Sequence, residues 1–224
     1  MVPVPKAFAL AFAQLGDRAV LAVLLKSVAV TLAIFAFGGL ALWQGLQWAL
    51  AGYSGTIGEI ASIAALAMSL IAGWLLFRIV ALFVIQFFAD EVVGAVEARH
   101  YPGVAPRKLG LAEEAGNGFR GALRALAVNA LALPFALALL VTGIGTALLF
   151  WAVNAWLLGR ELQDMVWLRL REGAHEHAPL SGGQRFMLGG AVAALLLVPF
   201  VNLLAPILGA AAATHLVHGR KIAR

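Results

Sequence analysis

Five polar residues within the apolar stretches of this sequence are the first candidates for chemistry. They are Arg78, Asn129, Thr142, Thr146 and Asn202. A polar side chain at membrane depth must face protein or a water-filled cavity, because lipid chains cannot hydrogen bond to it. Two interpretations of the Asn and Thr side chains stay open: they line a wet vestibule, or they hydrogen bond between helices. Arg78 either snorkels to the membrane boundary or faces an aqueous or anion-binding cavity.

Two pairs of histidines could suggest a metal site or proton handling. His175 and His177 are spaced i, i+2, so they do not share a helical face, and a solvated loop is favoured. His215 and His218 share a face at i, i+3, where interface anchoring or a hydrogen bond to a neighbouring helix is favoured over proton or metal handling. The sequence therefore predicts no metal site.

Two short motifs resemble nucleotide-binding signatures, and their context argues against both. LSGGQ (180–184) occurs in transport ATPases, but the sequence has no phosphate-binding G-x-x-x-x-G-K-[ST] loop. GNGFRG (116–121) follows AEEA, where a dinucleotide-binding fold would need a strand. No nucleophile, carboxylate pair or ligand cluster lies at membrane depth. We therefore expect no ATP, no cofactor and no enzymatic activity.

The composition indicates an integral membrane protein. Hydrophobic residues make up 62% of the 224-residue chain and charged residues only 12%, whereas soluble domains have about half and about a quarter. The net charge of +5 is confined to the breaks between apolar runs, which is typical of the positive-inside rule and argues against nucleic acid as a partner. Cysteine is absent, which excludes disulfides and thiol catalysis.

The elements that must position these residues form an all-α, single membrane domain over residues 1–224. Residues 27–58 contain no charge, and the turn near residues 52–58 contains no Lys or Arg, so that turn faces away from the cytoplasm and both termini are predicted to be cytoplasmic. Phe8, Phe12 and Leu15 predict a short interfacial helix with Lys6 and Gln14 on its wet face. The expected order is an interfacial helix (1–16), long transmembrane helices (18–51 and 60–100), a first hairpin (119–158), a cytoplasmic helix (159–172) and a second hairpin (184–218).

The two hairpins are predicted to penetrate the membrane only partly. Each arm of the second hairpin has about a dozen residues, or about 20 Å of helix, which is shorter than a hydrocarbon core of about 30 Å. Its centre contains Pro199 and Pro206, and the first hairpin breaks at residues 142–146. Ser181 and Gln184 predict a capping box before the second hairpin. Backbone groups at such tips need cover, so we expect an oligomer or a wet vestibule.

The chain resembles the CysZ sulfate permease family, also called the etoposide-induced-protein domain family. The resemblance is most specific in NAWLLGRE (154–161) and in VPFVNLLAP (198–206) through ATH (213–215). It implies two long transmembrane helices, two partly penetrating hairpins, an oligomer in the bacterial inner (plasma) membrane, and ATP-independent sulfate uptake for cysteine synthesis. It also implies an anion site at Gly16, Asp17 and Arg18, which match the family's Gly-Leu-Arg stretch. Asp17 departs from that pattern, and its carboxylate either repels sulfate or caps the following helix.

The sequence and this resemblance together predict a permease or channel-like protein for a small oxyanion, with sulfate as the expected substrate. Arg18 would recruit the anion, Arg78 would attract it along the path, and the hairpin tips would line or gate that path. The alternative is a non-transporting membrane scaffold or assembly protein, in which residues 16–18 only cap a helix and the tips pack dry.

Overall fold

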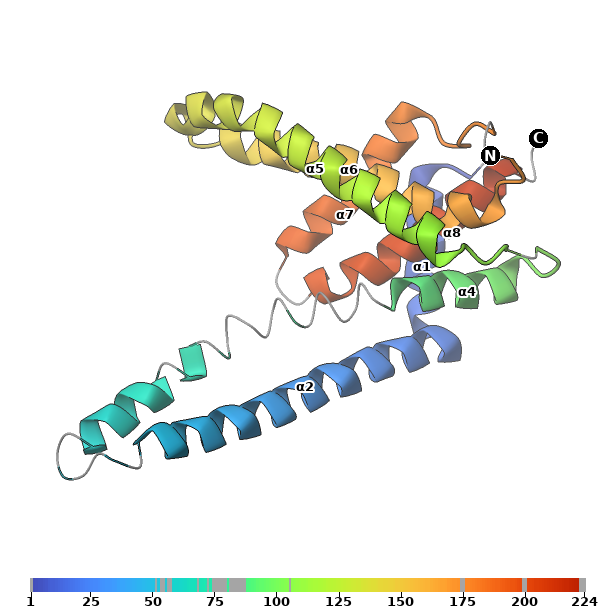
Figure 1. Cartoon of the computed structure of the whole chain (residues 1–224). Coiled ribbons are helices and arrows are strands. Elements are labelled where there is room, and N and C mark those ends of the chain that lie inside the picture. The colour runs from blue at the N-terminus through green and yellow to red at the C-terminus, as the bar shows by residue number, and fades with distance from the viewer. Residues whose placement is uncertain are drawn as a thin grey trace. The chain divides into compact units, whose positions relative to one another are not determined.

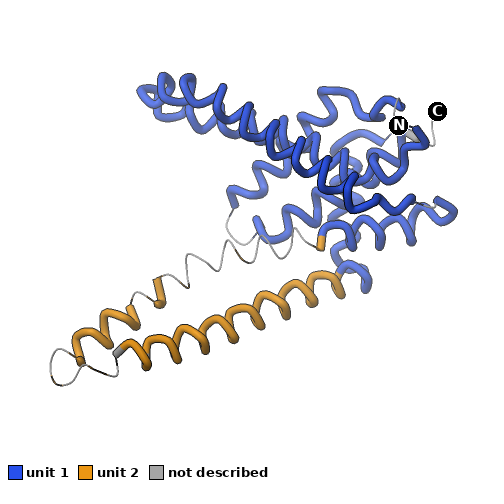
Figure 2. The backbone as a smooth tube through the Cα atoms, in the orientation of Figure 1, with its two compact units in different colours: residues 1–20, 89–224 blue, residues 21–88 orange. Residues whose placement is uncertain are grey.

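The computed structural model describes residues 2–50, 52, 55, 58–67, 69–71, 73, 80, 88–104, 106–173, 176–198 and 201–221, and these residues form helices, turns and loops without a strand (Figure 1). They divide into two compact units, which are coloured in Figure 2. Unit 1 contains residues 1–20 and 89–224, and unit 2 contains residues 21–88. The all-helical prediction is therefore confirmed for the described part of the chain.

Two helices are long and apolar enough to cross a membrane. The first is α2 (Arg18–Leu50), which begins in unit 1 and supplies most of the described part of unit 2. The second is α5 (Leu111–Leu139), which continues into the 3₁₀ helix η2 (Leu140–Thr142). Residues 125–142 carry no charge and span about 27 Å at the helical rise. This arm is thus close to the full thickness of a bilayer core, and the partial penetration expected for it stays a prediction.

The second long transmembrane helix predicted at 60–100 is described in part: residues 60–67 and 69–71 are helical in unit 2, and residues 68, 72, 74–79 and 81–87 lie outside the described residues. The C-terminal end of this predicted span is α4 (Ala89–His100) in unit 1, with Asp90 and Glu91 in its first turn and Arg99 and His100 in its last turn. This charge order stabilises a helix, because the macrodipole favours anions at the N-terminus and cations at the C-terminus.

α5 and α6 (Gly145–Leu170) form the first predicted hairpin. Gly143 makes the turn with φ 69°, a conformation that glycine adopts without steric cost. The Thr142 hydroxyl donates to the Leu139 carbonyl (2.7 Å) and accepts from the Gly145 N–H (2.9 Å), so it closes the turn. One helix, α6, covers both the second arm of this hairpin and the predicted cytoplasmic helix at 159–172.

The second predicted hairpin consists of α7 (Gly182–Leu197), η3 (Val201–Leu203) and α8 (Ala205–Lys221). The predicted capping box is present: the Ser181 hydroxyl accepts from the Gln184 N–H, and the Gln184 carboxamide accepts from the Ser181 N–H. Pro206 lies in the first turn of α8, where a missing N–H leaves no hydrogen bond unmade. Pro199 lies outside the described residues.

The core of unit 1 is built around α8. Helices α1 (Val4–Ala13), α4, α6 and α7 all pack against it, and nearly every side chain from Ala205 to His218 is buried. Small residues in α8 (Ala210–Ala213) allow this close packing on several sides. The buried cluster described below lies toward the C-terminal end of the same helix.

The helices α6 and α7 cross at a contact that only glycine allows. A Cβ atom on Gly159 would lie 1.8 Å from the Arg185 carbonyl oxygen, and one on Gly189 would lie 2.0 Å from the Ala155 carbonyl oxygen. The Trp151 indole N–H donates to the Gly190 carbonyl across the same contact (3.0 Å). The two backbones therefore touch directly, without side chains between them.

The exposed and buried residues of the N-terminal helix differ in part from the predicted water-facing side. Its buried residues are Val4, Ala7 and Ala11, and α1 packs these small side chains against α8. Gln14, expected to face water, is 5% exposed, whereas Phe12 is 48% exposed. The prediction was confirmed for Lys6, which is exposed. It was wrong for Gln14, because alanine gives little amphipathic contrast and because a buried hydrogen-bond partner for Gln14 comes from a distant part of the chain.

Candidate functional site

The predicted anion site lies where η1 (Gln14–Gly16) meets α2. Gly16 and Arg18 are exposed, and a Cβ atom on Gly16 would meet no heavy atom within 4 Å. The carboxylate of Asp17 is paired with the Arg99 guanidinium of α4 at 2.6 Å. In the described part of the chain Arg18 forms no ion pair. The site thus combines two guanidinium groups with one carboxylate, and the carboxylate is already engaged by Arg99.

Next to this site, a largely buried polar cluster joins η1, α4, α6 and α8. We call it the Glu97 cluster, and it consists of Gln14, Glu97, Tyr101, Arg169, His215 and His218. Glu97 is 4% exposed, and its two carboxylate oxygens lie 3.1 Å from His218 Nε2 and 3.5 Å from the Arg169 guanidinium. The Tyr101 ring stacks on His218 with centroids 4.3 Å apart. This agrees with the predicted hydrogen bonding of the histidine pair to a neighbouring helix.

Both ring nitrogens of His215 are engaged in this cluster. Nε2 lies 2.8 Å from the Gln14 amide nitrogen, and Nδ1 lies 2.8 Å from the Tyr101 hydroxyl. With the Gln14 amide as donor, Nε2 accepts, so Nδ1 carries the proton of a neutral ring. Burial, with the nearby His100 and His218, lowers the pKa of His215 to about 4.

This shift predicts a pH-dependent stability. An unfolded histidine titrates near pH 6.5, so between about pH 6.5 and about 4 the unfolded chain binds a proton that the folded chain excludes. His215 therefore contributes its full stability above about pH 6.5, and that contribution falls as the pH drops toward 4. We expect the thermal midpoint of the purified protein to fall across this window, and His215→Gln to reduce the slope. His177→Gln is the control, because His177 is exposed; equal slopes for all three proteins would contradict the assignment.

The vestibule candidates that the structure describes lie in α5, at the α5–α6 turn and in η3, and their lining of a vestibule stays a prediction. Asn129 donates to the Ala125 carbonyl of its own helix (2.8 Å), and Thr142 closes the α5–α6 turn. Thr146 donates across the hairpin to the Ala136 carbonyl of α5 (3.1 Å). Asn202 is buried in η3. No hydrogen bond joins these four side chains to one another in the described ranges; Arg78 and His175 lie outside the described residues.

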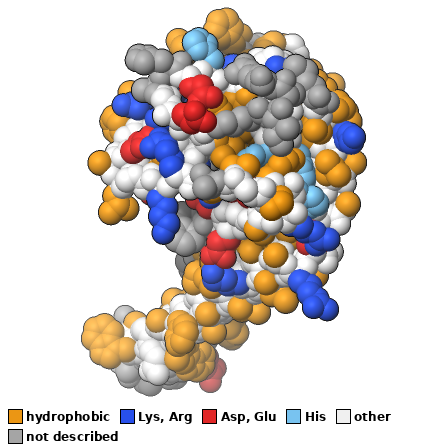
Figure 3. All heavy atoms as spheres, turned by 90° about the vertical axis from the view of Figure 1, so that its right-hand side faces the viewer, with side chains coloured by type: hydrophobic (Ala, Val, Ile, Leu, Met, Phe, Trp, Pro, Cys, Tyr) orange, Lys and Arg blue, Asp and Glu red, His pale blue; other side chains and the backbone are white. Residues whose placement is uncertain are grey.

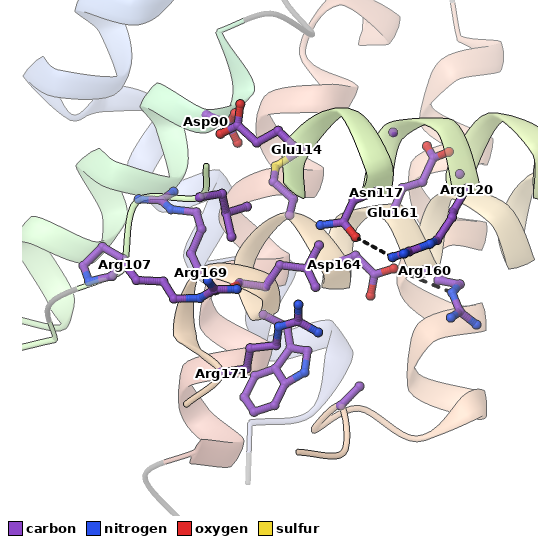
Figure 4. Close-up of a pocket in the computed structure, with 18 of the residues that line it drawn as sticks. Asp90, Arg107, Glu114, Asn117, Arg120, Arg160, Glu161, Asp164, Arg169 and Arg171 are labelled. Atoms are coloured by element: carbon purple, nitrogen blue, oxygen red, sulfur yellow. Dashed lines mark hydrogen bonds and ion pairs between the residues drawn. The ribbon is translucent and has the colours of Figure 1, made fainter. Parts of the chain in front are cut away.

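Unit 1 also contains a wide charged cleft of about 1160 Å³ between the 106–109 loop, α5 and α6 (Figure 4). Seven cationic and six anionic residues line it. The cations are Arg107, Lys108, Arg120, Arg124, Arg160, Arg169 and Arg171; the anions are Asp90, Glu91, Glu114, Glu161, Asp164 and Glu176. Burial raises the pKa of Glu161, against a smaller opposite effect of Arg124. The cleft can therefore hold water and ions, but its nearly balanced charge gives no strong selection for anions.

The surface of unit 1 gives the same mixture. Figure 3 shows Lys, Arg, Asp, Glu and His side chains interspersed on the face of unit 1 near the two chain termini. In unit 1, Arg107 and Arg171 both form ion pairs with Glu113, at 2.6 Å and 2.8 Å. Mixed charge of this kind is typical of a hydrated surface, and it agrees with the polar segments predicted between the apolar runs.

Comparison with known families decides the class of protein. The model of the family described as "Sulfate transporter CysZ/Etoposide-induced protein 2.4" matches residues 7–206. The chain belongs to this family. No curated protein and no solved structure gives a significant match. The resemblance to the CysZ family is thus confirmed, and with two helices able to cross a membrane the chain is a sulfate transporter-like membrane protein.

Sequence reasoning missed two parts of this CysZ-family chain. The first part is the charged cleft. Its one sequence signal is the i, i+4 spacing of Arg120 and Arg124 on α5, which does not reveal that α6 forms the other wall. The pairing of Asp17 with Arg99 had no signal in the spacing of the residues. It depends on the fold of unit 1, which brings Arg99 of α4 next to Asp17, the C-cap residue of η1.

Proposed function

We propose that this CysZ-family protein carries a small oxyanion, namely sulfate, across the bacterial inner membrane, either passively or with an ion gradient. Arg18 captures the anion at Gly16, Asp17 and Arg18. The observation that carries the proposal is the division of charge at this site: Arg99 engages the Asp17 carboxylate at 2.6 Å, and Arg18 is exposed without an ion pair among the described residues. Asp17 therefore does not cancel the charge of Arg18.

The position of Arg18 suits anion capture for two physical reasons. It is the first residue of α2, where the helix dipole and unbonded N–H groups favour a negative charge. The guanidinium group also offers several donors in a fork that matches a tetrahedral oxyanion. Since α2 is long enough to cross a membrane, an anion held at its first turn would lie at the entrance to the membrane.

The same proposal includes the route that the anion takes beyond Arg18. Arg78 attracts the anion along the path, and the hairpin tips with Asn129, Thr142 and Asn202 line or gate it. The protein assembles as a homo-oligomer that covers these tips, with both termini in the cytoplasm. Support comes from the exposure of the α5–α6 tip, where Val141 is 93% and Ile144 is 70% exposed, because backbone and side chains there need lipid or a second subunit as cover.

The test is entry of radiolabelled sulfate into liposomes that contain the purified protein. We expect uptake above that of empty liposomes, and a loss of roughly tenfold in Arg18→Ala, since one charge-assisted contact contributes about 1.5–3 kcal/mol. Lys6→Ala is the matched control, because it removes one exposed positive charge from α1. Arg99→Ala should also lower uptake, because it frees the Asp17 carboxylate beside Arg18.

The outcomes separate the transporter from the scaffold. Uptake that falls in Arg18→Ala and Arg99→Ala but persists in Lys6→Ala supports the proposed anion site. Uptake that is equal in all variants places capture elsewhere in the chain. A folded protein with no uptake above empty liposomes, for sulfate or for another small oxyanion, favours the non-transporting membrane scaffold.

A further inference from the structure

We propose that the cavity beside the α6–α7 crossing binds the phosphate group of an anionic phospholipid. The cavity has a volume of about 390 Å³ and is lined by Trp156, Arg160, Gly182, Gly183, Arg185 and Phe186. This inference depends on the chain lying in a membrane, and not on sulfate transport. It goes beyond the proposed function because the predicted anion residues Gly16, Asp17 and Arg18 do not line this cavity.

The charge of the cavity favours an anion. Its lining contains two arginines and no carboxylate. Arg185 forms no ion pair among the described residues. Arg160 forms an ion pair with Asp164, whose Oδ2 atom lies 3.6 Å from Arg160 Nε, and at this distance the buried Nε atom makes no hydrogen bond. Since Asp164 already faces Arg160 Nε, Arg185 is the guanidinium group in this lining that has no carboxylate partner among the described residues, and a phosphate oxygen can accept from it.

The cavity lies where the charge-free segments end, which is the position expected for lipid headgroups. Residues 125–158 and residues 186–219 carry no Asp, Glu, Lys or Arg; Arg160 is the first charged residue after the first run, and Arg185 is the last charged residue before the second run. Gly159 in α6 touches the Arg185 carbonyl in α7, so both runs end at the same level. The boundary between apolar and charged segments marks the membrane interface, where arginine and tryptophan are the typical anchors.

The composition of the lining favours an amphiphile over a free ion. Trp156 is 44% exposed, and Phe186 borders the same cavity; aromatic rings of this kind favour the boundary between headgroups and acyl chains. Gly182 and Gly183 are the first two residues of α7, and their backbone N–H groups have no acceptor among the described residues. The neighbouring Ser181 and Gln184 bond to each other in the capping box. Two guanidinium groups and two backbone donors can thus share the oxygens of one phosphate.

The experiment is native mass spectrometry of the full chain released from detergent micelles that contain phosphatidylglycerol or phosphatidylcholine with the same acyl chains. We expect the wild-type chain to retain phosphatidylglycerol preferentially. Arg185→Gln should weaken this preference on the order of tenfold, the effect of losing one charge-assisted contact. Arg185→Lys keeps the charge but loses the fork, so it should retain part of the preference. Lys108→Gln is the control, because it removes an exposed charge that does not line this cavity.

Three results would decide the matter. A preference that falls in Arg185→Gln and persists in Lys108→Gln, with unchanged thermal midpoints, supports the lipid site. An equal preference in Arg185→Gln and the wild-type chain overturns it. Displacement of phosphatidylglycerol by sodium sulfate or inorganic phosphate, but not by sodium chloride of the same ionic strength, also overturns it, because the cavity would then hold a free oxyanion. If Arg185→Gln does not fold, Arg160→Gln tests the same contact.

Discussion

Gly159→Ala is expected to destabilise this protein strongly, although the change adds a single methyl group. The new Cβ atom would lie 1.8 Å from the Arg185 carbonyl oxygen and 2.6 Å from its carbonyl carbon. The obstacle is backbone, which cannot rotate away as a side chain can, so α6 and α7 must separate. Overpacking of a tight contact typically costs about 1–3 kcal/mol, and we expect the cost here to reach the upper part of that range.

The control uses the same substitution in another helix. A Cβ atom on Gly118 in α5 would meet nothing within 4 Å, and alanine is favoured over glycine in a helix by about 1 kcal/mol. Gly118→Ala should therefore be neutral or stabilising, so identical mutations should shift the thermal midpoint in opposite directions. Thermal unfolding followed by tryptophan fluorescence would measure both. A midpoint for Gly159→Ala equal to that of the wild-type chain would show that the helices do not cross at this glycine.

Local chemistry explains which parts of the fold were predictable. The break at Gly143 and the capping box of Ser181 and Gln184 depend on residues that are neighbours in the sequence. Glycine in a left-handed turn and a Ser-x-x-Gln pattern have direct physical causes that need no tertiary contact. The two apolar segments of α2 and α5 are long enough to be recognised by composition alone.

Contacts between distant segments explain the rest. Gln14 bonds to His215 across 201 positions of the sequence, and no periodicity within residues 1–16 indicates that partner. The α6–α7 crossing needs Gly159 to meet Gly189, yet glycines spaced along single helices are common in membrane segments. For the candidate site, the resemblance to the CysZ family indicated Gly16, Asp17 and Arg18. The ion pair between Asp17 and Arg99 is visible only in the folded chain.

The second large effect is expected at Glu97. Its carboxylate is buried between His218 at 3.1 Å and Arg169 at 3.5 Å, and the His218 side chain is 1% exposed. Glu97→Ala would leave the Arg169 charge, which is 22% exposed, and the His218 Nε2 atom without their partner. Removing one member of a buried ion pair costs about 3–5 kcal/mol. We therefore expect a large fall in the thermal midpoint, with α4 and α8 losing their contact first.

A second variant separates charge from hydrogen bonding at this position. Glu97→Gln keeps a side-chain oxygen beside His218 but removes the negative charge beside Arg169, so its midpoint should lie between those of Glu97→Ala and the wild-type chain. Glu114→Ala is the control, since Glu114 is exposed on α5 and surface substitutions usually change stability by less than about 0.5 kcal/mol. If Glu97→Ala were as mild as Glu114→Ala, Glu97 would not be the buried link between α4, α6 and α8.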